Sequence, residues 1–113
     1  MRTINLLLVI SLLTLMGCEK IDKDCPDCIL KKTRELIKSQ TCDTGTSVSE
    51  WVFQGEHVYM FNYGTCGADD VAVVLNQYCE PLGSLGGFTG SQTINGINFY
   101  QNATLIKTIW KQD

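Results

Sequence analysis

Three features are missing from this sequence of 113 residues: an apolar run long enough to cross a membrane, an excess of basic over acidic residues, and a second histidine. The longest apolar stretch, near the N-terminus, covers about 13 residues, against the roughly 20 that a membrane-spanning helix needs. Nine Lys and Arg residues face twelve Asp and Glu residues, so the charge does not favour binding to nucleic acid. We therefore expect neither a spanning helix nor a nucleic-acid partner.

The sequence also lacks the motifs of common catalytic and metal-binding sites. His57 has no GxSxG nucleophile motif to accompany it. The glycine-rich residues 83–90 lack the Lys-Ser/Thr pair of a phosphate-binding loop. Asp69 and Asp70 do not have the acidic spacing of an EF-hand. We predict no enzyme activity, no metal site and no cofactor, and we interpret His57 as an exposed residue beside a turn.

The N-terminal residues are typical of a bacterial lipoprotein signal. Arg2 precedes a short apolar core. Leu15-Met16-Gly17-Cys18 then matches the lipobox, in which the cysteine is acylated and becomes the first residue of the mature chain. Each buried methylene of an acyl chain adds about 0.8 kcal/mol to membrane attachment. The alternatives are an ordinary signal peptide with a coincidental cysteine, and an uncleaved anchor.

This interpretation divides the chain into three parts. Residues 1–17 are the predicted signal peptide, residues 18–25 are the acylated Cys18 with a flexible tether, and residues 26–113 form one small domain. We expect the mature protein in the cell envelope, held by its lipid at the outer membrane, on the periplasmic or the surface face.

Residues 26–39 predict one amphipathic helix at the start of the domain. Pro26 suits a first helical turn, and Asp24 or Cys25 can cap it. At 3.6 residues per turn, one stripe of the helix is free of charge and consists of Ile29, Leu30, Thr33, Leu36 and Ile37. We interpret the opposite face as solvated, because it carries the charged residues Lys31, Lys32, Arg34, Glu35 and Lys38.

Residues 47–64 predict a β-hairpin, because β-branched and aromatic residues flank a short polar segment. We place the two-residue turn at Gly55-Glu56. Alternation along the strands then gives two faces. One face carries Trp51, Phe53, Val58 and Met60, and the other carries Val48, Val52, Tyr59, Phe61 and Tyr63.

The remaining segments predict further strands. Residues 71–75 are a short apolar run, and Asn95-Gly96 is a turn signal that pairs residues 93–94 with 97–100. β-Branched residues favour a terminal strand over residues 103–110. We therefore predict an α+β fold, in which one N-terminal amphipathic helix packs on a small antiparallel sheet of about four to five strands, held by disulfides.

Six cysteines are present, and small exported domains are often held together by disulfides. If Cys18 carries lipid, five thiols remain, so two disulfides leave one over. The spacing of Cys42, Cys66 and Cys79 lacks the pairs of a structural zinc ribbon.

Geometry limits how these cysteines pair. A helix over residues 26–39 is roughly 20 Å long, whereas bridged Cα atoms lie about 4.4–6.8 Å apart. Cys28 and Cys42, near its opposite ends, should therefore not meet. The predicted hairpin brings residue 66 near Cys42. We predict the pairs Cys42–Cys66 and Cys28–Cys79 with Cys25 spare, although the residues alone leave the choice between Cys25 and Cys28 open.

Cys25-Pro26-Asp27-Cys28 is also a Cys-x-x-Cys motif, as in thiol-redox proteins. A thioredoxin-like site places this motif between a strand and a helix and lowers the pKa of its first thiol. Here a polar segment precedes the motif, so a thiol-redox function using Cys25 and Cys28 is an alternative rather than the leading hypothesis.

Eight motifs follow one another over nearly all of residues 27–111, and the first of them begins at Pro26. They are PDCI, CDTG, WVFQGEHVYMF, YGTCGAD, YC, LGSLGGFTG, TINGINF and IKTIW. In this order they resemble a domain of unknown function found in small Bacteroidota lipoproteins. The resemblance implies a cell-envelope location and no particular activity. It also implies that Cys28, Cys42, Cys66 and Cys79 are the four cysteines of the pattern, which agrees with Cys25 as the spare one.

Two surfaces are candidates for binding. One helix covers only one face of a small sheet, so Tyr59, Phe61, Tyr63 and Val52 form a candidate binding face unless the C-terminal run with Trp110 covers them. A second candidate is an apolar loop tip formed by Leu85, Gly86, Gly87 and Phe88. The leading hypothesis is a non-catalytic, lipid-anchored module that binds a protein or a glycan. A small disulfide-held protease inhibitor with a rigid loop at residues 82–90 is another alternative.

Overall fold

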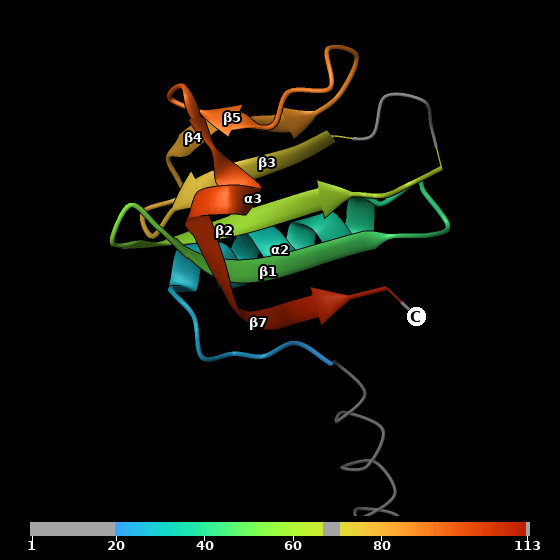
Figure 1. Ribbon diagram of the computed structural model, residues 1–113. Helices are drawn as coiled ribbons and strands as arrows, with labels where there is room; N and C mark the ends of the chain where they lie inside the picture. The colour runs from blue at the N-terminus through green and yellow to red at the C-terminus, as the bar shows by residue number, and fades with distance from the viewer. Residues whose placement is uncertain (1–19, 67–70, 113) are drawn as a thin grey trace, which may run out of the picture.

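The computed structural model describes residues 20–66 and 71–112. They form a five-stranded antiparallel sheet of order β4-β3-β2-β1-β7, with α2 on one face and a short hairpin with α3 on the other (Figure 1). The predicted α+β fold is confirmed. The elements are α2 Asp27–Ser39, β1 Thr46–Phe53, β2 Glu56–Tyr63, β3 Val71–Asn76, β4 Pro81–Gly86, β5 Thr93–Ile94, β6 Ile97–Asn98, α3 Phe99–Asn102 and β7 Ala103–Lys111.

The predicted signal peptide, residues 1–17, and the predicted lipid attachment site, Cys18, lie outside the described residues. Asp69 and Asp70 lie outside them too. Within the described ranges, neither helix combines the length and the apolar character that crossing a membrane requires.

α2 packs on the sheet through the stripe that the sequence predicted. Ile29, Thr33 and Leu36 are buried, and the Thr33 hydroxyl donates a hydrogen bond of 2.8 Å to the Ile29 carbonyl within the helix. The helix begins one residue later than predicted, because Pro26 is the N-cap and no side chain caps the first turn. The core beneath α2 collects side chains from four strands and from residue 21, namely Ile21, Val48, Tyr59, Phe61, Leu75 and Ile109.

α2 therefore covers the face that we had assigned to binding. Tyr59 and Phe61 are buried under it, and Val52 is half-buried. Tyr63 alone of the four stays largely exposed, at 51%. The prediction of an exposed patch formed by all four residues is wrong. Both faces of β2 are apolar, and alternation separates the two faces without indicating which one the helix covers.

The opposite face is covered by β5, β6 and α3. The turn Asn95-Gly96 joins β5 to β6, as predicted, and the Asn98 side chain caps α3. Phe99 of α3 is fully buried. Its ring lies 5.2 Å from that of Trp51 and 5.1 Å from that of Phe53, measured between ring centroids. A second core thus forms on the Trp51 side of the sheet.

The turn between β1 and β2 lies one residue earlier than predicted. Phe53 pairs with Glu56, so the turn is Gln54-Gly55. Both turn residues have positive φ, 56° and 78°, as a type I′ turn requires. Moving the turn by one residue shifts the register by two, and side chains alternate with a period of two, so the two predicted faces keep their residues.

β4 is a strand that the sequence did not predict, because its glycines indicated a loop. It pairs with β3 from Val71↔Gly86 to Leu75↔Pro81. Gly83 fits here because a Cβ would lie 2.7 Å from Cδ1 of Ile94. Leu85 is only 2% exposed and belongs to the second core, so its assignment to an apolar loop tip is wrong.

The segment before α2 lies against β7. The backbone N–H of Asp22 donates to the Ile109 carbonyl at 2.8 Å. The Lys107 ammonium donates to Asp22 Oδ1 at 3.2 Å and to the Asp24 carbonyl at 2.6 Å, and Ile21 is buried in the core under α2. Residues 21–25, part of the predicted flexible tether, are thus attached to the domain by the buried Ile21 side chain and by these hydrogen bonds, and they run beside β7 (Figure 1).

Both predicted disulfides are present. Cys28–Cys79 joins α2 to the turn between β3 and β4, with 6.2 Å between the Cα atoms. Cys42–Cys66 joins the chain after α2 to the chain after β2, with 5.7 Å between the Cα atoms. Cys25 is the free cysteine of the described residues, as predicted.

Candidate functional site

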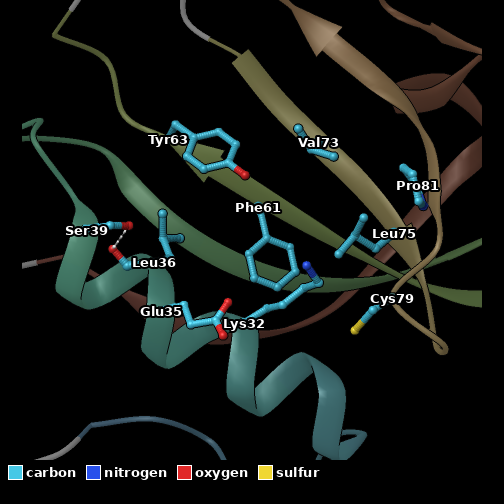
Figure 2. A pocket seen from close by; sticks show the side chains of 10 residues that line it. All are labelled: Lys32, Glu35, Leu36, Ser39, Phe61, Tyr63, Val73, Leu75, Cys79 and Pro81. Carbon is cyan, nitrogen blue, oxygen red and sulfur yellow. Dashed lines mark hydrogen bonds between the residues drawn. The ribbon is translucent and has the colours of Figure 1, made fainter.

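A groove runs between α2 and the strands β2, β3 and β4 (Figure 2). It exists because α2 lies behind β1 and β2 in Figure 1 and leaves the β3–β4 side of the same sheet face open. Its volume is about 320 Å³. Helix, strand and turn residues line it: Lys32, Glu35, Leu36, Ser39, Phe61, Tyr63, Val73, Leu75, Cys79 and Pro81.

The floor of the groove is apolar. Leu36, Phe61 and Leu75 are buried there, and Val73 is half-buried beside them. Phe61 and Val73 are cross-strand partners of β2 and β3, so the register places both side chains on the helix side of the sheet. The floor thus continues the core beneath α2 towards β3, with the half-buried Val73 as its most accessible residue.

The rim of the groove is polar on one side and mixed on the other. Lys32, Glu35 and Ser39 lie three and four residues apart, so they share one side of α2. Figure 2 shows the three emerging from the helix, facing Tyr63 of β2 across the floor. Tyr63 is 51% exposed and offers both a ring and a hydroxyl. An apolar group that approaches the floor would therefore pass between polar and charged side chains.

One end of the groove is closed by the Cys28–Cys79 disulfide and its turn. The Asn76 carboxamide oxygen organises this turn, since it accepts hydrogen bonds of 2.9 Å from the backbone N–H groups of Tyr78 and Glu80. Cys79 has a φ of 64°, which directs its side chain towards α2. The disulfide thereby fixes the distance between helix and turn, and with it the width of the groove.

The predicted site residues separate into three places. Phe61 and Tyr63 line the groove, whereas Tyr59 does not and Val52 lies on β1. Gly86 ends β4 and Gly87 starts the following turn, in which the Gly90 N–H donates to the Gly87 carbonyl at 3.1 Å. Phe88 projects from this turn and is 92% exposed.

The Cys-x-x-Cys motif does not form a dithiol. Cys28 is bonded to Cys79, which leaves Cys25 without its motif partner. Burial raises the pKa of the Cys25 thiol above its ordinary value, and the neighbouring carboxylates of Asp22, Glu50 and Asp24 raise it further. Only the Lys107 ammonium lowers it. A reactive redox cysteine needs the opposite shift.

His57 is exposed beside the β1–β2 turn, as predicted. Its Nδ1 lies 2.7 Å from Oε2 of Glu50, a buried carboxylate on the neighbouring strand. The partner is therefore a carboxylate rather than a serine hydroxyl. Burial of the Tyr59 side chain raises the pKa of Tyr59, and the nearby Glu50 carboxylate raises it further. This arrangement joins β1 to β2 and supplies no nucleophile.

Sequence reasoning missed most of the groove. The sequence pattern places Lys32 and Glu35 on a solvated helix face, assigns no role to Ser39, and predicts Val73 and Leu75 as ordinary strand residues. A usable signal was present: a helix of 13 residues is too small to cover five strands. The apolar side chains of the uncovered strands must then be exposed or meet something else.

A comparison with known families matches residues 34–112 to a domain of unknown function, DUF6970. The chain belongs to the DUF6970 family. The match starts within α2 and ends just after β7, so the DUF6970 region contains nine of the ten groove residues, with Lys32 just before it. No curated protein and no solved structure matches the chain.

Proposed function

We propose that this protein is a non-catalytic binding module of the cell envelope, and that the groove beside α2 is where it binds a protein or glycan partner. The observation that carries the proposal is the groove itself, in which buried Phe61 and Leu75 form a floor and exposed Tyr63 stands at the rim. Concave apolar sites with a few polar groups at the edge are the usual form of a binding site.

The envelope location rests on the N-terminal sequence and on the disulfides. Leu15-Met16-Gly17-Cys18 supports cleavage after residue 17 and acylation of Cys18, as in small Bacteroidota lipoproteins. Two disulfides in a domain of this size favour an oxidising compartment. We propose attachment at the outer membrane, on its periplasmic or its surface face.

The groove is tested by co-purification after reversible cross-linking in cells that express the full chain. Tyr63→Ala is compared with Tyr100→Ala, because both tyrosines are 51% exposed and Tyr100 lies on α3, on the opposite side of the sheet. We expect Tyr63→Ala to lower partner recovery several-fold and Tyr100→Ala to leave it unchanged. Equal recovery from both variants would remove the groove from the proposal.

The anchor is tested separately by metabolic labelling with an alkyne fatty acid. The native chain is expected to incorporate the label and to sediment with membranes, and Cys18→Ser to lose both properties. Cys25→Ser is the matched control, because it removes the free thiol of the described residues and leaves the lipobox intact. Labelling that persists in Cys18→Ser would contradict the lipoprotein assignment.

The two alternative functions have less support. A protease inhibitor presents an extended loop, but residues 82–86 belong to β4 and Leu85 is in the core. A thiol-redox protein needs both cysteines of its motif, but Cys28 is held in a disulfide with Cys79.

A further inference from the structure

We propose that the partner is an acidic protein segment that places an apolar side chain on the groove floor while its carboxylates lie along α2. This inference rests on the proposed function and adds the chemistry of the ligand. It follows from the distribution of charge around the groove and from the shape of the floor.

The charge of α2 is opposite to that of the whole protein. The net charge of the chain is −3, with nine Lys and Arg residues. Four of these nine lie within α2, against two acidic residues there, Asp27 and Glu35. The basic residues of the helix are Lys31, Lys32, Arg34 and Lys38, and all four are exposed.

These basic residues continue from the groove onto the outer side of the helix. Lys32 lines the groove itself. Lys31, Arg34 and Lys38 are three and four residues apart and border a shallow depression on the outer side of α2, which Leu30, Asp27 and Glu35 also line. A segment that enters the groove beside Lys32 and crosses α2 therefore meets four basic side chains, against the two acidic ones of the helix, Asp27 and Glu35. An acidic segment gains from this arrangement, and a basic one is repelled.

The floor favours a protein side chain over a sugar. A sugar ring stacks on the exposed face of an aromatic ring, but Phe61 is only 4% exposed and lies among Leu36, Val73 and Leu75. Tyr63 is the aromatic residue of the groove with a largely exposed ring. The accessible part of the floor is the half-buried aliphatic Val73 beside Tyr63, and this pair suits contact with a leucine or phenylalanine side chain.

The test uses the full chain with its disulfides intact and two fluorescent peptides of equal length. Each peptide has Leu-Phe at its centre, flanked by four Glu residues in one and by four Lys residues in the other. Fluorescence anisotropy is expected to show at least ten-fold tighter binding of the Glu peptide. The preference should shrink as salt rises, because exposed charges are screened.

Charge reversal locates the effect. The variant Lys31→Glu with Lys32→Glu is expected to weaken binding of the Glu peptide about ten-fold, equivalent to about 1.4 kcal/mol. The matched control reverses two exposed lysines that lie outside α2 and outside the groove lining, Lys23→Glu with Lys111→Glu, and should leave the affinity within two-fold. All four positions are exposed, so both variants should retain the native circular dichroism spectrum.

Several results would overturn the inference. These are equal binding of both peptides, no binding of either at millimolar concentration, and loss of affinity in the control variant as large as in the α2 variant. Polygalacturonate that displaces the Glu peptide and binds more tightly would assign the site to an acidic glycan instead. None of these outcomes changes the comparison of Tyr63→Ala with Tyr100→Ala in cells, so the two proposals fail separately.

Discussion

Cys28 and Cys79 are bonded to each other although they lie 51 positions apart in the sequence, and this bond holds the first turn of α2 against the turn between β3 and β4. The same turn closes one end of the groove. The position of the helix on the sheet, and therefore the shape of the candidate site, depends on this contact between two distant parts of the chain.

Removing this disulfide should destabilise the domain. Closing a loop of 51 residues restricts the unfolded chain by about 4 kcal/mol, and closing one of 24 residues by about 3.5 kcal/mol. We expect Cys28→Ser with Cys79→Ser, and Cys42→Ser with Cys66→Ser, to lower the free energy of unfolding by up to these amounts. Urea denaturation measures the change. Cys25→Ser is the control, and a loss below about 1 kcal/mol for both disulfide variants would contradict the prediction.

Phe99 should be the most sensitive residue of the second core. It is fully buried between Trp51 and Phe53, so Phe99→Ala leaves a cavity and is expected to cost about 3–5 kcal/mol. Tyr100→Ala, at the neighbouring half-exposed position, should cost about 1 kcal/mol or less. Thermal or urea denaturation compares the two. A similar small loss for both would show that α3 does not seal this core.

Gly64 should not tolerate a side chain. Its φ is +116°, and a Cβ would lie 2.5 Å from Sγ of Cys42 and 2.9 Å from the Thr44 carbonyl oxygen. We expect Gly64→Ala to cost at least about 3 kcal/mol and to reduce formation of the Cys42–Cys66 disulfide. Gly90→Ala also has positive φ but meets nothing within 4 Å, so it should cost only about 1–2 kcal/mol. Mass measurement after thiol alkylation and urea denaturation provide the two readouts.

Much of this fold could be predicted from local patterns. The spacing of Ile29, Thr33 and Leu36 predicted the buried side of α2, and Asn95-Gly96 predicted the small hairpin, because both signals are contained in a few adjacent residues. The Cys42–Cys66 disulfide could be predicted because the helix keeps Cys28 away from Cys42 and the hairpin brings residue 66 near Cys42. The choice of Cys28 rather than Cys25 as the partner of Cys79 stayed open from the residues alone and was implied by the family resemblance.

The layers around the sheet could not be predicted in the same way. Tyr59, Met60 and Phe61 are consecutive and all buried, so β2 gives no sign of which face meets the helix. β4 was missed because its glycines resemble those of a loop. Gly83 is needed in the strand because Ile94 lies close to it, and composition does not reveal a contact between residues distant in sequence. The groove follows from these layers, so only Phe61 and Tyr63 among its residues were predicted as a site.

The Cys25 thiol should react slowly. Burial raises its pKa above the ordinary value, so in the folded protein the neutral thiol persists at pH values where an exposed cysteine has begun to ionise. We expect its alkylation by iodoacetamide at pH 8 to be several-fold slower in the native protein than in urea with the disulfides intact. The rise of the rate with pH should be displaced to higher pH in the native protein than in urea. A native rate that exceeds the rate in urea would revive the thiol-redox alternative.

The most direct test of the binding groove is photo-cross-linking in living cells with benzoylphenylalanine at position 63 or at position 100. The two tyrosines are equally exposed, at 51%, but only Tyr63 lines the groove. The groove proposal predicts a discrete cross-linked species from position 63 and none from position 100. Cross-links of equal yield at both positions, or at position 100 alone, would contradict it.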